Sequence, residues 1–140
     1  RKLAKNVHLL GRYPPEKMPR FFALSDVLLV TLRKEPIFAL TIPSKVQSYL
    51  ACAKPIIAAL DGEGARIIEE AKAGIVCPAE NPISLAQAVI TMYRMTENER
   101  GDMGARGMSY FRHHFERSRL LNRLDEWMTE LGKEKITCAS

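Results

Sequence analysis

The residues best suited to chemistry lie in one segment, residues 41–55, in which a helix is predicted to begin at Ser44 and Lys45. The first turn of a helix leaves backbone N–H groups without partners, and the helix dipole adds partial positive charge at that end. A phosphate placed there meets free donors, to which Ser44 adds a hydroxyl and Lys45 an ammonium group. The pattern therefore indicates a site for a phosphorylated ligand. One alternative stays open, in which Ser44 only caps the helix and Lys45 only faces solvent.

Four short apolar runs, separated by helical patterns, must position this segment. Each run is continuously apolar rather than alternating, which is typical of strands buried on both faces of a sheet. Strands that alternate with helices predict an α/β fold with a parallel sheet, in which ligands bind at the carboxyl ends of the strands. The predicted strands are residues 7–10, 27–32, 55–60 and 74–77, and the helices between them lie near residues 18–25, 45–53 and 64–73.

The rest of the chain predicts helices. Asn81 followed by Pro82 is a helix start signal, and from Glu97 onward the sequence is helical with a break near Phe115. Glycine inside a helix usually allows another backbone to approach closely. Three glycines at a spacing of three residues therefore predict close packing of this late helix; they are Gly101, Gly104 and Gly107.

The last helix carries one apolar stripe. A stripe at helical spacing most often packs on the protein core, which is the interpretation we favour, although a membrane or a partner could also cover it. Its residues are Leu120, Leu124, Trp127 and Leu131.

The net charge of +5 is unevenly distributed. Residues 1–60 carry ten Lys/Arg and three Asp/Glu, a net +7, whereas residues 61–140 carry eleven and thirteen, a net −2. This asymmetry suggests an anionic partner such as a phosphorylated small molecule or a membrane surface, although scattered Lys/Arg more commonly form only a solvated basic face, and that alternative stays open. Nucleic acid is not expected, because the sequence has no run of Lys/Arg and no interleaving of aromatic and basic residues.

The lengths of the apolar runs and the spacing of Cys and His argue against membrane-spanning, disulfide-bonded and metal-binding proteins. The apolar runs are far shorter than the roughly 20 residues that span a bilayer. Three cysteines without a Cys-x-x-Cys pair predict neither disulfides nor zinc and fit a reducing compartment, and His8 and the adjacent His113 and His114 lack metal-ligand spacing. The chain begins at Arg1 without an initiator Met, so we expect it to be a piece of a longer polypeptide.

An ordered series of short motifs resembles the C-terminal half of a retaining glycosyltransferase of family 4. The series consists of residues 6–11, 26–30, 43–57 and 69–76, followed by Met103-Gly104 and His114-Phe115. The resemblance implies a Rossmann-like parallel sheet fragment, the C-terminal half of a GT-B glycosyltransferase, with a helical C-terminal tail. It also implies that residues 1–140 are part of the nucleotide-sugar-binding domain, with no acceptor domain among them.

The resemblance also assigns roles to particular residues. Pro43, Ser44 and Lys45 match the loop and helix start that meet the donor's diphosphate and sugar. Gly11, Arg12 and Tyr13 match the loop near the nucleobase. The resemblance assigns no residue of this chain a catalytic role and implies no catalytic metal. No cofactor is expected either, because the nucleotide diphosphate-sugar is the donor substrate.

The sequence departs from the family at its paired acids. The Glu-x7-Glu pattern would place them at Leu40 and Ser48, and Glu35 lies nearby but out of register. In the family, the second acid commonly binds the nucleotide ribose. Ser48 occupies that position here, and its shorter side chain is expected to make only a shorter contact with the donor.

The implied function is transfer of a sugar from a nucleotide diphosphate donor to a bacterial surface glycan or lipid-linked acceptor, of the O-antigen, capsule or exopolysaccharide type. The acceptor would bind through the missing N-terminal domain. The implied location is the cytoplasm, with peripheral association at the inner face of the plasma membrane left open. A non-catalytic nucleotide-sugar-binding subunit or docking module of a split transferase is the alternative. We also expect residues 7–10, deprived of neighbouring strands, to cause self-association or a rearranged sheet edge.

Overall fold

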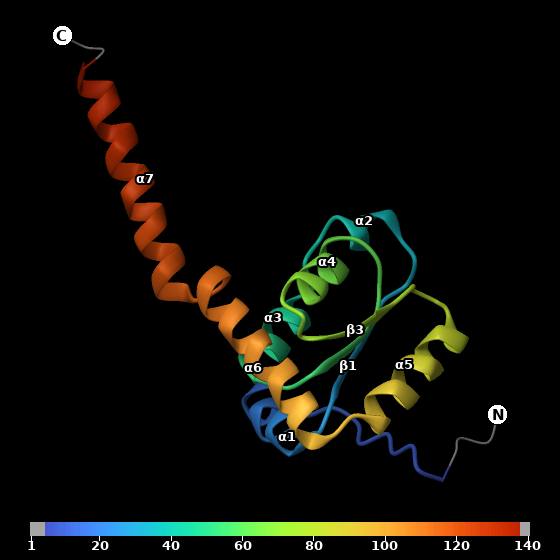
Figure 1. The fold of residues 1–140 in the computed structure, drawn as a ribbon. Helices are drawn as coiled ribbons and strands as arrows, with labels where there is room; N and C mark the ends of the chain where they lie inside the picture. Colours follow the sequence, from blue (N-terminus) through green and yellow to red (C-terminus); the bar gives the residue numbers. More distant parts are fainter. Residues whose placement is uncertain (1–4, 138–140) are drawn as a thin grey trace.

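The structure is a computed structural model that describes residues 5–137, with side chains as far as residue 132. Three parallel strands form one sheet in the order β1-β2-β3, and helices pack on both faces (Figure 1). The described elements are η1 Pro15–Lys17, α1 Met18–Leu24, β1 Leu28–Thr31, α2 Pro36–Ala39, α3 Ser44–Ala51, β2 Ile56–Ala59, α4 Glu63–Glu70, β3 Gly74–Cys77, α5 Pro82–Arg94, α6 Glu97–His114 and α7 Arg117–Thr137. The expected Rossmann-like α/β sheet with a helical C-terminal tail is confirmed.

Two apolar clusters hold the layers together. On one face of the sheet, Val46 and Leu50 of α3 and Ile67 of α4 pack against the side chains of Leu28 and Ile56. On the other face, Ala88 and Met92 of α5 cover Ile57, which lies beside Ile75 in the strand register. The continuous apolar runs of the central strand thus arise because both of its faces are buried, as the sequence indicated.

The predicted strand at residues 7–10 is wrong. These residues have no regular secondary structure and are exposed, with Leu9 at 81%. A strand is stabilised by hydrogen bonds to a neighbouring strand, and within the described residues β1 pairs only with β2. Residues 7–10 are therefore apolar, but no described strand forms hydrogen bonds with them. The expected self-association through it stays a prediction.

The helical half follows its start signals. The Asn81 side chain accepts a hydrogen bond from the amide of Ser84 at 3.0 Å, and Thr96 and Glu99 form a capping box at the start of α6. The predicted break near Phe115 separates α6 from α7. Close packing is confirmed at Gly104 and Gly107 but wrong at Gly101, where a side chain would meet open space.

The interpretation of the last stripe as core is also wrong. Leu120, Leu124, Trp127 and Leu131 are each about half exposed, because α7 continues beyond α6 and projects from the body of the molecule (Figure 1). Helical spacing identifies an apolar face but does not say whether another element lies against it.

An exposed hydrogen-bond network ties α4 to α6. The Tyr110 hydroxyl on α6 donates to Glu70 on α4 at 2.9 Å, and Arg66 pairs with Glu70 and Glu63. The Tyr110 hydroxyl, followed by the Arg66 guanidinium, lowers the pKa of Glu70 below its ordinary value.

This lowered pKa predicts acid sensitivity. A carboxyl whose pKa is lower in the folded than in the unfolded state contributes stability above its unfolded pKa of about 4.3 and loses it as pH falls through the folded value. We expect the thermal midpoint to fall on acidification below about pH 5, and to fall less steeply in Glu70→Gln. Circular dichroism melts across this pH range check the prediction. Identical pH profiles for the two proteins would contradict it.

Candidate functional site

Helix α3 begins with its polar groups facing outward. Pro43 occupies the N-cap position, and no side chain caps the helix, so Ser44 is the first helical residue rather than the cap. Ser44 therefore does not act as the cap, whereas the other part of the alternative, that Lys45 only faces solvent, stays open. Ser44 and Lys45 are exposed, and their amides belong to the first turn, which lacks intrahelical acceptors.

The start of α3 lies beside the start of α4, at the carboxyl edge of the sheet. A Cβ on Gly64, in the first turn of α4, would lie 3.0 Å from Cδ of Pro43. In the turn between β2 and α4, a Cβ on Gly62 would lie 2.1 Å from the carbonyl oxygen of Ala39 at the end of α2. Gly62 also has a φ of +79°, which other residues rarely adopt. Because it has no side chain, α2 and the segment that leads into α3 can pack against the end of β2.

A hollow follows the carboxyl ends of the strands at this edge, and we call it the carboxyl-edge hollow. One part encloses about 450 Å³ between the β1–α2 connection and the end of β2, and an adjoining part of about 420 Å³ reaches the start of α5. The first part is lined by Leu32, Arg33, Lys34, Glu35, Pro36, Phe38, Ala39 and Asp61. The second is lined by Thr31, Leu32, Arg33, Ala59, Glu80, Asn81, Pro82 and Leu85.

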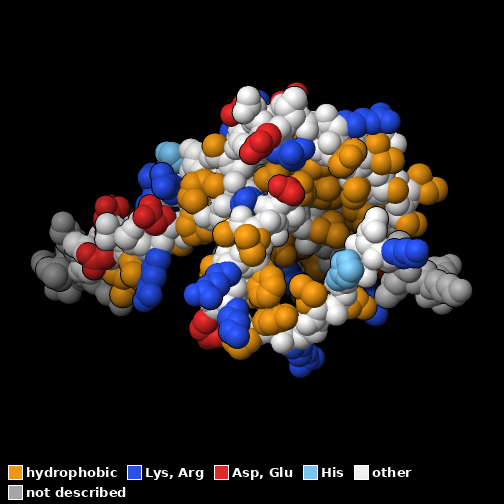
Figure 2. Space-filling view, turned by 90° about the horizontal axis from the view of Figure 1, so that it is seen from below, with side chains coloured by type: hydrophobic (Ala, Val, Ile, Leu, Met, Phe, Trp, Pro, Cys, Tyr) orange, Lys and Arg blue, Asp and Glu red, His pale blue; other side chains and the backbone are white. Residues whose placement is uncertain are grey.

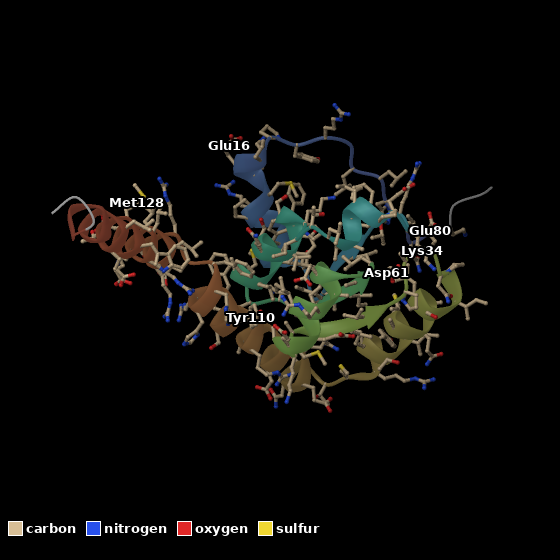
Figure 3. The ribbon with its side chains drawn as sticks, turned by 90° about the horizontal axis from the view of Figure 1, so that it is seen from above. Glu16, Lys34, Asp61, Glu80, Tyr110 and Met128 are labelled. Atoms are coloured by element: carbon tan, nitrogen blue, oxygen red, sulfur yellow. The ribbon has the colours of Figure 1, made fainter. Side chains whose placement is uncertain are left out.

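Charged side chains gather around this hollow. Figure 3 shows Lys34, Asp61 and Glu80 on the same side of the molecule, each from a segment that follows a different strand. Asp61 also accepts a hydrogen bond from the amide of Ala79 at 3.3 Å, which joins the loops after β2 and β3. The hollow therefore offers two cations for phosphate and carboxylates that can accept hydrogen bonds from hydroxyl groups.

Sequence reasoning missed these hollow residues. A usable signal was present, because Arg33, Lys34, Asp61 and Glu80 each come within three residues of the end of a predicted strand. Parallel strands end at the same edge of a sheet, so polar residues directly after them converge there.

The predicted donor-contact residues lie on one helix. Pro43, Ser44, Lys45 and Ser48 belong to α3 or its cap, and the Ser48 hydroxyl donates to the carbonyl oxygen of Ser44 at 3.1 Å. Ser44 and Lys45 share the carboxyl edge with the hollow but do not line it. In the part of the chain that the structure describes, Lys45 forms no ion pair, so its charge is available to a ligand.

The predicted nucleobase loop lies elsewhere. The ring of Tyr13 packs against the ring of Phe21 on α1, with centroids 4.7 Å apart, and Gly11 and Arg12 are exposed. Figure 1 shows α1 at the edge of the sheet where β1 begins, whereas α2 lies at the opposite edge, where β1 ends. The structure thus does not bring Gly11, Arg12 and Tyr13 together with the start of α3.

The two described cysteines are not activated nucleophiles. Burial raises the pKa of the Cys52 thiol, and the nearby Lys54 lowers it to a lesser extent. Burial also raises the pKa of the Cys77 thiol, whereas catalytic thiols require a lowered one. Cys138 lies outside the described residues.

Among residues 5–132, no group of three or more His, Cys, Asp or Glu side chains is placed to hold a metal ion. Over the same part of the chain, no helix is long and apolar enough to cross a membrane. The expectation that the chemistry needs neither metal nor cofactor stays a prediction.

A parallel sheet covered by helices on both faces, with a hollow at its carboxyl edge, places the chain among Rossmann-like α/β proteins that bind ligands at this edge. Comparison with known sequences then identifies the family. The chain belongs to the glycosyl transferases group 1, which match residues 1–95.

A curated relative supports this assignment. Over 81 residues the chain is 40% identical to a probable glycosyltransferase WbjE of Pseudomonas aeruginosa, and the aligned part is 56% of this chain and 20% of that protein. The chain therefore spans about a fifth of the length of the curated relative that it matches. No solved structure gives a significant match.

Proposed function

We propose that this chain is the donor-binding part of a retaining family 4 glycosyltransferase and that residues 1–140 form part of its nucleotide-sugar-binding domain. The observation that carries the proposal is the start of α3, where Ser44 and an unpaired Lys45 adjoin the carboxyl-edge hollow. Family membership supports glycosyl transfer by the longer protein. The donor is proposed to be a nucleotide diphosphate-sugar and the acceptor a glycan or lipid-linked glycan.

In this proposal, the cationic groups bind the diphosphate of the donor and the carboxylates bind its sugar. The first-turn amides of α3, the Ser44 hydroxyl and the Lys45 ammonium stabilise negative charge on the diphosphate as it departs. Arg33 and Lys34 contribute further positive charge from the wall of the hollow. The carboxylates of Glu35 and Asp61 in the same wall accept hydrogen bonds from sugar hydroxyls.

The proposed setting is the assembly of bacterial surface polysaccharides in the cytoplasm, of the O-antigen, capsule or exopolysaccharide type. Two facts support this setting. The Pro43-Ser44-Lys45 motif resembles that of transferases with such products, and the curated relative is a bacterial probable glycosyltransferase. The alternative, a non-catalytic subunit of a split transferase, uses the same donor site and differs only in whether the acceptor domain is on the same polypeptide.

Calorimetric titration with a panel of nucleotides tests the proposal. We expect the chain to bind UDP or GDP more tightly than the corresponding monophosphate, because the second phosphate reaches the start of α3. Equal affinity for the diphosphate and the monophosphate, or no binding of any nucleotide, would overturn the proposed site.

The 140 residues alone are expected not to transfer sugar. Catalysis requires donor and acceptor to be held together in reacting geometry, and we assign the acceptor site to another part of the longer protein. Incubation of the purified chain with a nucleotide-sugar and a lipid-linked acceptor, followed by mass spectrometry of the acceptor, checks this prediction. A glycosylated product would contradict it.

A further inference from the structure

The first part of the carboxyl-edge hollow has a wall that is largely apolar. Its apolar residues come from the β1–α2 connection and from α2, and we call them the α2 wall; they are Leu32, Pro36, Phe38 and Ala39. Phe38 is 38% exposed and belongs to neither of the two apolar clusters that hold the layers together. Its ring is therefore available to a ligand in the hollow rather than needed by the core.

Backbone hydrogen bonds hold the α2 wall in place. The amides of Phe38 and Ala39 donate to the carbonyl oxygen of Glu35, at 3.0 and 3.3 Å. Pro36 stands at the start of α2, where its ring fixes φ and where it has no N–H that would need a partner. The wall is thus preorganised, which lowers the entropic cost of binding a ligand against it.

Two carboxylates line the same part of the hollow as the α2 wall. Glu35 immediately precedes α2, where its side chain does not cap the helix, and it forms no ion pair with another described residue. Asp61 reaches the hollow from the end of β2. Figure 3 shows Asp61 and Lys34 on the side of the molecule where α2 lies. The hollow therefore offers an apolar surface and hydrogen-bond acceptors to one ligand.

Exposure of apolar side chains alone does not identify a ligand site. Hydrophobic side chains also gather on the face of the molecule seen in Figure 2, and Leu9 and Tyr93 are more exposed than Phe38. The α2 wall differs because carboxylates line the same hollow and because only four residues separate α2 from the start of α3. A ligand group that fits this wall combines an apolar part with a hydrogen-bond donor and belongs to a phosphorylated molecule.

We propose that the donor sugar carries an acetamido group, which the α2 wall binds; this inference rests on the proposed donor site. The acetyl methyl packs against Phe38 and Pro36, and the amide N–H donates to the carboxylate of Glu35. The first part of the hollow, about 450 Å³, has the size of a small-ligand pocket. A sugar with hydroxyl groups only would place a polar group against an apolar wall, and a 6-deoxy sugar would bring a methyl without the N–H.

Calorimetric titration of the chain with UDP-N-acetylglucosamine and UDP-glucose tests the inference. The two donors differ only in the acetamido group, and we expect the acetamido donor to bind about tenfold more tightly, because its methyl is buried against the α2 wall. N-acetylglucosamine 1-phosphate and glucose 1-phosphate give the same comparison without a nucleobase. Binding of a nucleoside diphosphate with equal affinities within each pair of sugars would overturn the inference and leave the proposed donor site standing. No binding of any of these molecules would overturn both.

Phe38→Ser tests the wall itself and is expected to reduce the preference for the acetamido donor from about tenfold to about twofold. The ratio of the two affinities is the readout, because a general loss of donor binding lowers both affinities together. Ile37→Ser is the matched control: Ile37 is the neighbouring residue of α2, is 63% exposed and does not line the hollow, so the preference should persist. An unchanged ratio in Phe38→Ser, with helicity intact by circular dichroism, would overturn the assignment, as would the same loss in both variants.

Discussion

Gly104→Ala is expected to lower the free energy of unfolding by about 3 kcal/mol, the largest stability effect among our predictions. Gly104 is buried where α6 crosses the end of α3, and a Cβ there would lie 2.1 Å from the carbonyl oxygen of Ala53. The obstacle is backbone, so no side-chain rotation can relieve the overlap. Helix α6 must instead move away from α3, which opens the core around Leu50.

Gly101→Ala is the matched control, in the same helix and one turn earlier. A Cβ at Gly101 meets nothing within 4 Å, and alanine favours a helix by about 1 kcal/mol over glycine. We therefore expect this variant to be slightly more stable than the wild type. Urea unfolding curves of both variants give the comparison. Similar stability changes of the same sign would show that α6 is not packed against α3 as described.

Lys45→Ala is expected to weaken the binding of a nucleoside diphosphate by about one to two orders of magnitude. A charge-assisted contact contributes roughly 1.5–3 kcal/mol, and Lys45 supplies the full positive charge at the start of α3. The variant should leave the fold intact, because the Lys45 side chain is exposed and forms no ion pair among the described residues.

Lys54→Ala is the matched control for this binding experiment. Lys54 follows the other end of α3, about 12 Å along an eight-residue helix, so its removal should change the affinity much less. Calorimetric titration of both variants with the same nucleoside diphosphate decides between them. Equal affinities would identify Lys45 as a surface charge only.

The fold could be predicted largely from local patterns. Continuous apolar runs found β1, β2 and β3 to within two residues. The reason expected for such runs, burial of both faces, holds for the central strand β2, whereas β1 leaves one face exposed. The start signal at Asn81 acts within one helical turn and is therefore visible in sequence. The start of α3 was predicted for the same reason.

The errors concern what lies next to an element rather than the element itself. Residues 7–10 have the composition of a strand but lack a neighbouring strand among the described residues, and the apolar stripe of α7 has the spacing of a core helix but projects outward. Gly101 and Gly104 look alike in sequence, yet only Gly104 has a backbone against it. For the site, the helix start signal pointed to α3 but not to the charged residues of the hollow. Those residues have no motif of their own, and their only signal is that each follows the end of a predicted strand; they are Arg33, Lys34, Asp61 and Glu80.

The donor site is the central claim, and a chemical-shift titration tests it most directly. Backbone amide spectra of the labelled chain should be recorded while a nucleoside diphosphate is added. The account predicts the largest shifts at the amides of Ser44 and Lys45, with further shifts at Arg33, Lys34 and Glu35 on the wall of the carboxyl-edge hollow. Shifts confined to other surfaces, such as the end of α3 near Lys54 or the projecting helix α7, would contradict it.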